Sequence, residues 1–238
     1  MTWFDLTLPT PAENLAFDEA LLDGAESGAG GESLRFWESA DYFVVVGYAN
    51  RIASEVNVPA CEAEGVPIHR RCSGGGTVLQ GPGCLNYALV LRALEGTPLA
   101  SIPGANGHIM ERNRAAVERL LGRPVHVQGH TDLSLEGRKF SGNSQRRRRR
   151  FLLFHGTFLL GFDLLRLERL LAMPTREPDY RGGRSHREFI TTLGLGAGDL
   201  KAALQATWQA TSLGAAPPPP LPPALLEKYR TRAWNWRH

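Results

Sequence analysis

The sequence has few of the residues that would indicate a secreted, membrane or zinc-binding protein. It contains three cysteines in 238 residues, an odd number without Cys-x-x-Cys spacing, which argues against a disulfide framework and favours reduced thiols. No apolar run approaches the roughly 20 residues that cross a bilayer. The first residues, MTWFDLTLPTP, lack the basic and apolar regions of a signal peptide. We therefore expect a cytoplasmic protein that has no membrane partner.

An excess of one charge is also lacking. The net charge is +3, too small to indicate a nucleic-acid-binding protein. The charge is nevertheless uneven, because residues 146–150 are five consecutive arginines. A run of this kind is not buried, and the favoured interpretation is a solvated hairpin turn between two strands. The alternative is a docking patch for an acidic partner, since exposed positive charge speeds encounter with negative surfaces.

The most informative stretch runs from Arg70 to Thr77 (RRCSGGGT), where two arginines lead into three glycines. Glycine has no Cβ, so its backbone adopts positive φ and lets a ligand come close. Successive free N–H groups then form an anion-binding concavity, and Arg71 can add a bidentate charged fork to phosphate. A mobile surface turn is the alternative for an isolated glycine triplet. The flanking segments GVPIH and LNYALVL are typical of strands, which favours a phosphate loop between two strands.

Hydrophobic periodicity along the chain predicts both helices and strands. The expected helices cover residues 14–22, 108–121, 162–171 and 199–211, with a short helix in 224–238. The expected strands cover residues 34–37, 42–46, 65–69, 85–91, 125–127, 132–135, 138–140 and 151–160. Residues 174–187 are expected to be an ordered loop at best, and the proline tract 215–223 a stiff polyproline spacer. The pattern predicts an α+β fold with mixed or antiparallel sheets and packed helices.

A second cluster of chemical interest surrounds Lys139, in the segment GRKFSGNSQ. A lysine flanked by glycines at a strand end can point its ammonium into a cleft where the backbone comes close. Together with Arg71, it would place two cations around one polyphosphate or acyl phosphate. An exposed lysine on a hairpin is the commoner case, so this cluster alone is weak evidence.

The order of these blocks carries a resemblance. Three blocks follow one another in the order RRCSGGGTVLQGPGCLNYALVL, DLSLEGRKFSGNSQ and FHGTFLL. In this order they resemble the lipoate-protein ligase A family of the biotin/lipoate ligase superfamily. NLAFDEALL, LRFWES and VVVGYAN upstream and EKYRTRAWNW at the end extend the likeness to nearly the whole chain. The resemblance implies a fold like the biotin/lipoate ligase catalytic domain over residues 1–214. Residues 215–238 would form a proline-rich spacer and an aromatic tail packed on the same domain.

The resemblance also implies an activity. The family activates lipoate with ATP and Mg²⁺ to lipoyl-AMP and transfers the lipoyl group to a lysine of a lipoyl domain. The acceptors would be E2 subunits of 2-oxoacid dehydrogenases, the H protein of glycine cleavage or similar proteins. Lys139 matches the catalytic lysine that contacts the acyl carbonyl and the adenylate phosphate, and no metal ligand is assigned. The residues that would bind nucleotide or acyl group are Arg71, Ser73, Gly74, Gly75, Gly76, Thr77, Val78, Leu79, Asn86, Asp132, Lys139 and His155.

Several alternatives remain open at this level. For His155, a satisfied strand histidine is an equal alternative. Octanoyltransferases of the same superfamily use no ATP but need a reactive cysteine, which the stretches MPTREPDYRGGRSH and HVQGHTDLSLEG lack. Cys72 and Cys84 lie near the glycines, and packing is the favoured role for both. A nucleic-acid-binding protein that uses residues 146–150 is less favoured.

A last alternative concerns partners and substrate. Biotin ligation is disfavoured because its family uses a Gly-Arg-Gly-Arg loop. Some relatives of the lipoate-protein ligase A family carry an accessory domain after the KY…WN block, whereas this sequence stops at His238. A separate accessory polypeptide is therefore a possible partner, if adenylation depends on it.

Overall fold

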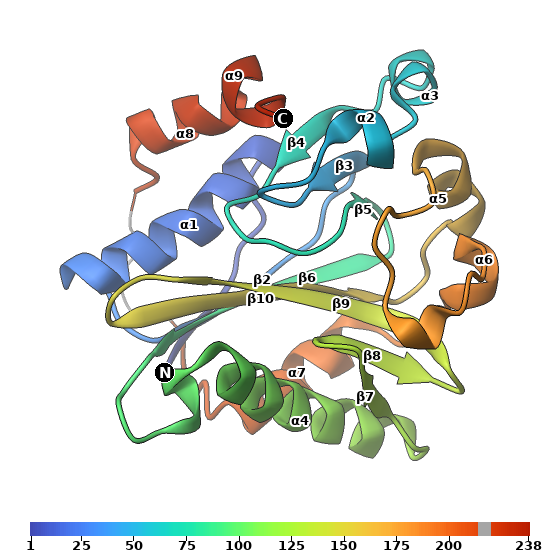
Figure 1. The fold of residues 1–238 in the computed structure, drawn as a ribbon. Coiled ribbons are helices and arrows are strands. Elements are labelled where there is room, and N and C mark those ends of the chain that lie inside the picture. Colours follow the sequence, from blue (N-terminus) through green and yellow to red (C-terminus); the bar gives the residue numbers. More distant parts are fainter. Residues whose placement is uncertain (214–219) are drawn as a thin grey trace.

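A mixed sheet runs through the middle of the molecule in the order β11-β1-β2-β6-β10-β9-β8-β7 (Figure 1). The computed structural model describes residues 1–213 and 220–238. Within them β1 pairs in parallel with β11 and β2, and the remaining neighbours are antiparallel. A smaller sheet has the order β4-β3-β5. The strands are β1 (Thr2–Asp5), β2 (Ser33–Trp37), β3 (Phe43–Val46), β4 (Ile68–Arg70), β5 (Val78–Gln80), β6 (Cys84–Arg92), β7 (His126–Gln128), β8 (Asp132–Leu135), β9 (Arg138–Arg147), β10 (Phe151–Leu159) and β11 (Ser212–Leu213).

Helices cover both faces of the large sheet. In Figure 1, α4 and α7 lie below it, while α1, α8 and the smaller sheet lie above it. The described helices are α1 (Pro11–Ser27), α2 (Ile52–Glu55), α3 (Val58–Ala63), η1 (Pro98–Ala100), α4 (Ile102–Leu121), α5 (Leu164–Leu170), η2 (Asp179–Arg181), α6 (His186–Phe189), α7 (Ala197–Thr207), α8 (Pro223–Arg230) and α9 (Arg232–Asn235). The expected α+β fold with a mixed sheet and packed helices is confirmed.

The ends of two helices are explained by the residue types found there. At the start of α1, Thr10 and Glu13 form a reciprocal capping box around Pro11, which satisfies N–H groups that the first turn leaves free. Gly28 ends this helix with φ +86°. Gly122 ends α4 with φ +64°, as the sequence predicted, because glycine adopts the left-handed conformation without a Cβ clash.

Strand β9 is longer than the sequence predicted and contains an irregularity that matters for the site. It runs to Arg147, so the arginine run begins inside the strand and turns into β10. Against β8, the partner of Leu133 is Ser141 but the partner of Ser134 is Lys139. Phe140 is thus an extra residue, and a β-bulge of this kind re-aims the side chain next to it. It changes the face to which Lys139 points.

The C-terminal residues pack on the N-terminal half of the chain. Tyr229 on α8 donates to the carboxylate of Glu19 on α1 at 2.7 Å. Trp234 on α9 donates to the carbonyl of Arg70 at 2.9 Å, next to the glycine-rich segment. Of the expected proline spacer, residues 215–219 lie outside the described residues. None of the described helices combines the length and the apolar composition that a membrane span requires.

Candidate functional site

The segment of residues 72–77, called the glycine loop below, is folded around the guanidinium of Arg71. Arg71 is only 8% exposed, and its Nη2 donates to the carbonyl oxygens of Gly74 at 2.5 Å and Gly76 at 2.7 Å. Its Nε donates to the hydroxyl of Ser73 at 3.2 Å. Burial lowers the pKa of Arg71 to about 10, so the side chain is still charged at neutral pH. The guanidinium therefore stabilises the conformation of the loop by donating to its oxygens.

This arrangement differs from the fork that the sequence suggested for Arg71. All three of its nitrogens donate to oxygens of the protein, the third to the carbonyl of Val45 at 3.5 Å. In a planar trans peptide the C=O and the N–H point in opposite directions. Carbonyls turned towards Arg71 therefore leave the N–H groups of Gly75 and Thr77 turned away from it. An anion would meet these backbone donors, with the Arg71 charge behind them.

A buried hydrogen-bond chain connects the glycine loop to α1. Ser73 Oγ lies 2.5 Å from His155 Nε2, and His155 Nδ1 lies 3.2 Å from Asp18 Oδ2. Arg35 Nη1 lies 2.7 Å from the other oxygen of Asp18. Because the hydroxyl of Ser73 accepts from Arg71, we assign its hydrogen to His155 Nε2 and the imidazole hydrogen to Nδ1. His155 is thus a core histidine with both ring nitrogens bonded, one to Ser73 of the glycine loop and one to Asp18 of α1.

Lys139 reaches the same face of the sheet as the glycine loop. A Cβ built on Gly142 would lie 2.8 Å from the Lys139 ammonium, so the ammonium lies over Gly142. Two residues further along β9, Ser144 Oγ donates to the carbonyl of Gly74 at 2.9 Å. Residues two apart in a strand share a face and lie about 7 Å apart. The structure thus brings the glycine loop and Lys139 to neighbouring positions on one face of β9.

Asp132 orients the lysine. Its Oδ1 lies 2.7 Å from Lys139 Nζ, and its Oδ2 accepts a hydrogen bond from the hydroxyl of Tyr180 at 2.8 Å. Burial and the charge of Asp132 together raise the pKa of Tyr180, so the phenol stays a donor. An ammonium has three hydrogens, and Asp132 takes one of them. Lys139 therefore retains donors for a ligand.

Asn86 lies on the same face of the sheet and has an unused donor. Thr157 on β10 pairs with both Asn86 on β6 and Gly142 on β9, which places Asn86 two strands from the strand of Lys139, with β10 between them. Thr157 Oγ1 donates to Asn86 Oδ1 at 2.6 Å and accepts from Gln80 Nε2 at 2.6 Å. Asn86 Nδ2 and Gln80 Oε1 are buried and have no hydrogen-bond partner among the described residues. A buried polar atom of this kind is costly unless a ligand satisfies it.

The remaining predicted residues continue the glycine loop into the smaller sheet. The hydroxyl of Thr77 donates to the carboxylate of Glu55, a buried side chain that also accepts from Asn50 at 2.7 Å. Val78 and Leu79 belong to β5 and pair with Val45 and Val44 of β3. Their backbones anchor the C-terminal end of the loop, and Leu79 belongs to a packed hydrophobic cluster.

The three cysteines are buried thiols. Cys61, Cys72 and Cys84 are between 1% and 3% exposed. Burial raises the pKa of the Cys61 thiol to about 11, and of the Cys72 and Cys84 thiols to about 12. The thiolate is the nucleophilic form, and only about 1 in 10⁴ or fewer of these groups is ionised at pH 7.

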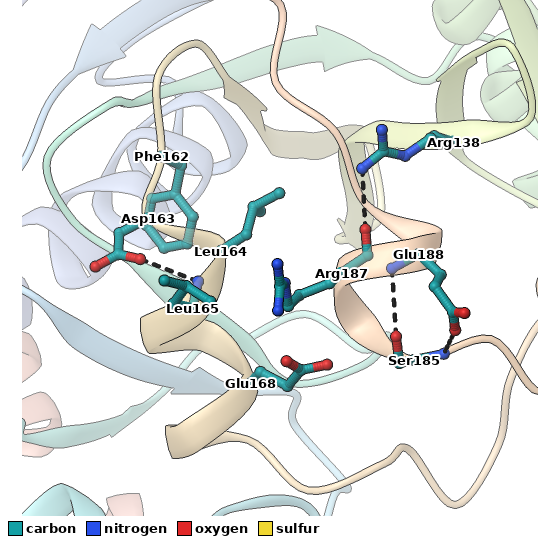
Figure 2. Close-up of a pocket in the computed structure, with 9 residues that line it drawn as sticks. All are labelled: Arg138, Phe162, Asp163, Leu164, Leu165, Glu168, Ser185, Arg187 and Glu188. Atoms are coloured by element: carbon teal, nitrogen blue, oxygen red, sulfur yellow. Dashed lines mark hydrogen bonds between the residues drawn. The ribbon is translucent and has the colours of Figure 1, made fainter.

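One cavity adjoins the site, and another lies elsewhere in the described structure. One, of about 310 Å³, adjoins the glycine loop and is lined by Tyr48, Gly74, Gln145 and their neighbours. A second, of about 680 Å³, lies between the start of α5 and α6, where Arg138 donates to the backbone of Arg187 (Figure 2). The second cavity contains none of the residues expected to bind nucleotide or acyl group.

The geometry agrees with a comparison against protein families. Residues 10–201 match the model of the lipoyl protein ligase A/B catalytic domain. The chain belongs to this family. The lipoyl protein ligase A/B match includes the glycine loop, Lys139, Asp132 and His155, and therefore the whole arrangement described above.

Relatives in this family have names of two kinds. A probable lipoate-protein ligase A of Mycoplasma pneumoniae is 33% identical over 175 residues, covering 72% of this chain and 49% of the relative. An octanoyltransferase LipM of Carboxydothermus hydrogenoformans is 32% identical over 187 residues, covering 71% and 68%. The chain thus spans about half the length of the ligase relative. A crystal structure of lipoate-protein ligase A bound with ATP has the same fold, with a TM-score of 0.83 at 21% identity, covering 99% of this chain and 98% of that one.

Sequence patterns did not identify several residues that complete the site. Asp18 and Arg35 lie in ordinary helix and strand patterns, and only the 2.7 Å contact in the structure shows that they form an ion pair. Glu55 is a single polar residue without a motif, and Thr157 lies in the block FHGTFLL without an assigned role. Tyr180 lies in the segment expected to be a loop. Each is brought to the site by long-range packing, so no local signal could have found it.

Proposed function

We propose that this chain is a lipoate-protein ligase that activates lipoate with ATP to lipoyl-AMP and transfers the lipoyl group to a lysine of a lipoyl domain. The observation that carries the proposal is the contrast between its thiols and its cations. All three cysteines are buried with raised thiol pKa values, whereas Lys139 and the glycine loop share one face of β9. Acyl transfer without a thiolate nucleophile needs another activated acyl group, which adenylation supplies.

The first reaction step suits this arrangement. A lipoate carboxylate oxygen attacks the α-phosphorus of ATP, the bond between that phosphorus and the bridging oxygen breaks, and pyrophosphate leaves with the electron pair. Negative charge grows on the phosphate oxygens in the transition state. The Lys139 ammonium and the loop N–H groups are fixed donors for that charge, and fixed donors in a partly buried site stabilise the transition state most.

The second step uses the same lysine. The neutral amine of the acceptor lysine attacks the acyl carbonyl of lipoyl-AMP, an amide bond forms, AMP leaves with the electrons of the anhydride bond, and the proton lost from the amine passes to solvent. Lys139 can polarise the carbonyl because Asp132 holds its ammonium in place. Asn86 Nδ2, the buried donor without a partner, suits the acyl carbonyl or carboxylate oxygen.

Magnesium fits this site as a companion of the nucleotide. No group of three or more metal-ligating side chains occurs among the described residues. Mg²⁺ is usually held by one or two carboxylates together with substrate phosphates, and Asp132 and Glu55 are the carboxylates next to the lysine and the loop. When bound there, Mg²⁺ would neutralise phosphate charge.

The test is one assay with two donors. The purified chain is incubated with ATP, Mg²⁺ and lipoate, or with octanoyl carrier protein without ATP, and mass spectrometry of a lipoyl domain shows which donor labels it. The proposal expects labelling with ATP and lipoate and pyrophosphate release. If pyrophosphate appears only after a second polypeptide is added, the chain needs a separate accessory partner. Labelling from the carrier protein alone contradicts the proposal.

An octanoyltransferase is the second candidate, because one relative carries that name at 32% identity. It requires a cysteine nucleophile, and Cys72 is the cysteine within the glycine loop. We expect Cys72→Ala and Cys84→Ala to keep more than about half of the wild-type rate of lipoyl transfer, because small buried thiols act as packing groups. Cys61→Ala, in α3, is the matched control for the cost of removing a buried thiol. Abolition of acyl transfer by Cys72→Ala or Cys84→Ala, with Cys61→Ala active, would favour the octanoyltransferase.

A further inference from the structure

The arginine run divides into two parts with different surroundings. Arg148 lies 2.8 Å from Asp23, and Arg150 pairs with Glu26 at 3.6 Å, so both are tied to carboxylates of α1. Arg149 is exposed at the tip of the hairpin. These three residues lie beyond the last residue of β9. They form the hairpin turn that the sequence predicted for the run.

The other two arginines line the cavity of about 310 Å³ beside the glycine loop. Arg146 lies with its guanidinium 5.5 Å from the ring centre of Tyr48, and its Nε is buried with no hydrogen-bond partner in the described part of the chain. Arg147 lies on the other face of β9, since its partner Leu152 packs with α4, and it donates there to the carbonyls of Leu99 and Ala100 and to Gln145 Oε1. None of the described lining residues is an aspartate or glutamate. Arg146 is therefore a cation of this cavity with no counter-charge in the described wall.

The position of this cavity follows from the face of β9. Three residues of β9 follow one another on this face: Gly142, Ser144 and Arg146. The Lys139 ammonium lies over Gly142, and Ser144 is bonded to Gly74. The pairing of Arg146 with Leu153 agrees, because Leu153 packs with α1 on that side. At about 3.3 Å per residue, Arg146 lies about 13 Å along the strand from Gly142. The glycine loop lies between the two cationic positions.

We propose that the cavity beside Arg146 binds the β- and γ-phosphates of ATP and, after adenylation, the pyrophosphate that leaves. The inference rests on the proposed ligase function, in which the α-phosphate lies between Lys139 and the glycine loop. The remaining phosphates then extend along β9 to Arg146. Arginine binds phosphate oxygens in a bidentate manner, and the buried Nε of Arg146 gains the partner that it lacks. The charge that pyrophosphate acquires on leaving is stabilised there.

The experiment uses two arginines of the same run. Arg146→Gln removes a cavity cation, and Arg149→Gln removes an exposed cation of equal charge outside the cavity. Isothermal titration calorimetry with inorganic pyrophosphate and Mg²⁺ is expected to show at least about 10-fold weaker binding for Arg146→Gln. Arg149→Gln should stay within about twofold of the wild type. AMP, which lacks the outer phosphates, should bind the wild type and Arg146→Gln alike.

The outcomes separate this inference from the ligase proposal. Equal weakening by both variants would show only a long-range charge effect and overturn the inference. Unchanged pyrophosphate binding by Arg146→Gln would also overturn it. So would an Arg146→Gln variant whose KM is raised for the lipoyl domain but not for ATP, because Arg146 would then bind the acceptor protein. In these cases lipoyl-AMP formation by the wild type still stands. Failure of the wild type to form lipoyl-AMP would contradict the ligase proposal itself. Arg146→Lys keeps the charge, and its affinity for pyrophosphate is expected to lie between those of the wild type and Arg146→Gln. This intermediate affinity would show that the loss in Arg146→Gln is not caused by a folding defect.

Discussion

Replacing Lys139 with methionine is expected to lower the rate of lipoyl-AMP formation by about 10²–10³-fold, the usual effect of removing one fixed donor from an oxyanion-type site. The ammonium lies over Gly142 and is held by Asp132 at 2.7 Å, so no other side chain of the described site can take its position. Methionine keeps the length and most of the apolar stem. The measurement is single-turnover formation of the adenylate from ATP and lipoate.

Two further variants give this result its meaning. Lys139→Arg keeps the charge but spreads it over a larger planar group, and we expect it to recover part of the rate. Lys201→Met removes a lysine of α7 that pairs with Asp5 and Glu38, and should leave the rate within about twofold. Wild-type rates for Lys139→Met, with intact folding, would remove Lys139 from the mechanism.

The largest loss of stability is expected for Arg35→Met. Arg35 is fully buried, and its partner Asp18 is 1% exposed. Removing the guanidinium leaves a buried carboxylate whose remaining partner is His155, and breaking a buried pair in this way costs about 3–5 kcal/mol. Arg35 also donates to the backbone of Leu6 and Asn14, and these carbonyls would lose their partner. Urea denaturation followed by circular dichroism measures the free energy of unfolding.

The matched control for this substitution is an exposed ion pair. Arg123 pairs with Glu136 at 2.8 Å, and both side chains are about half exposed or more. Such pairs contribute about 0–1 kcal/mol, so Arg123→Met should change the free energy of unfolding by less than about 1 kcal/mol. If Arg35→Met costs no more than Arg123→Met, the buried chain from Asp18 to the glycine loop does not stabilise the fold.

Local patterns predicted much of the secondary structure because the relevant signals are short-range. Gly122 was predicted to end a helix and does so with positive φ, and segments rich in aromatic, aliphatic or β-branched residues became β2, β3 and β10. The short strands β1 and β5 were not predicted. Strand β9 was predicted to end at Phe140, and residues 146–150 were predicted to be a hairpin turn. Pairing with the buried strand β10 extends β9 to Arg147, so the first two arginines of the run belong to the strand.

The motifs likewise predicted the residues of the candidate site but not the contacts that each makes. Arg71 was expected to bind phosphate directly, whereas it holds the loop carbonyls. His155 was expected either at the site or as a satisfied core residue, and its bonds to Ser73 and Asp18 show that it is bonded on both nitrogens beside the loop. Both results depend on distances between residues that are far apart in the chain.

The sequence by itself determined the family, the fold class, the glycine loop and the lysine, because these depend on residue types at short spacing. The tertiary structure alone decided three things: the face to which Lys139 points, the bonding state of the cysteines and arginines, and the buried chain from Arg35 to Ser73. Each of these depends on a register shift of one residue or on burial. Burial and register arise from contacts between distant segments, which residue patterns do not encode locally.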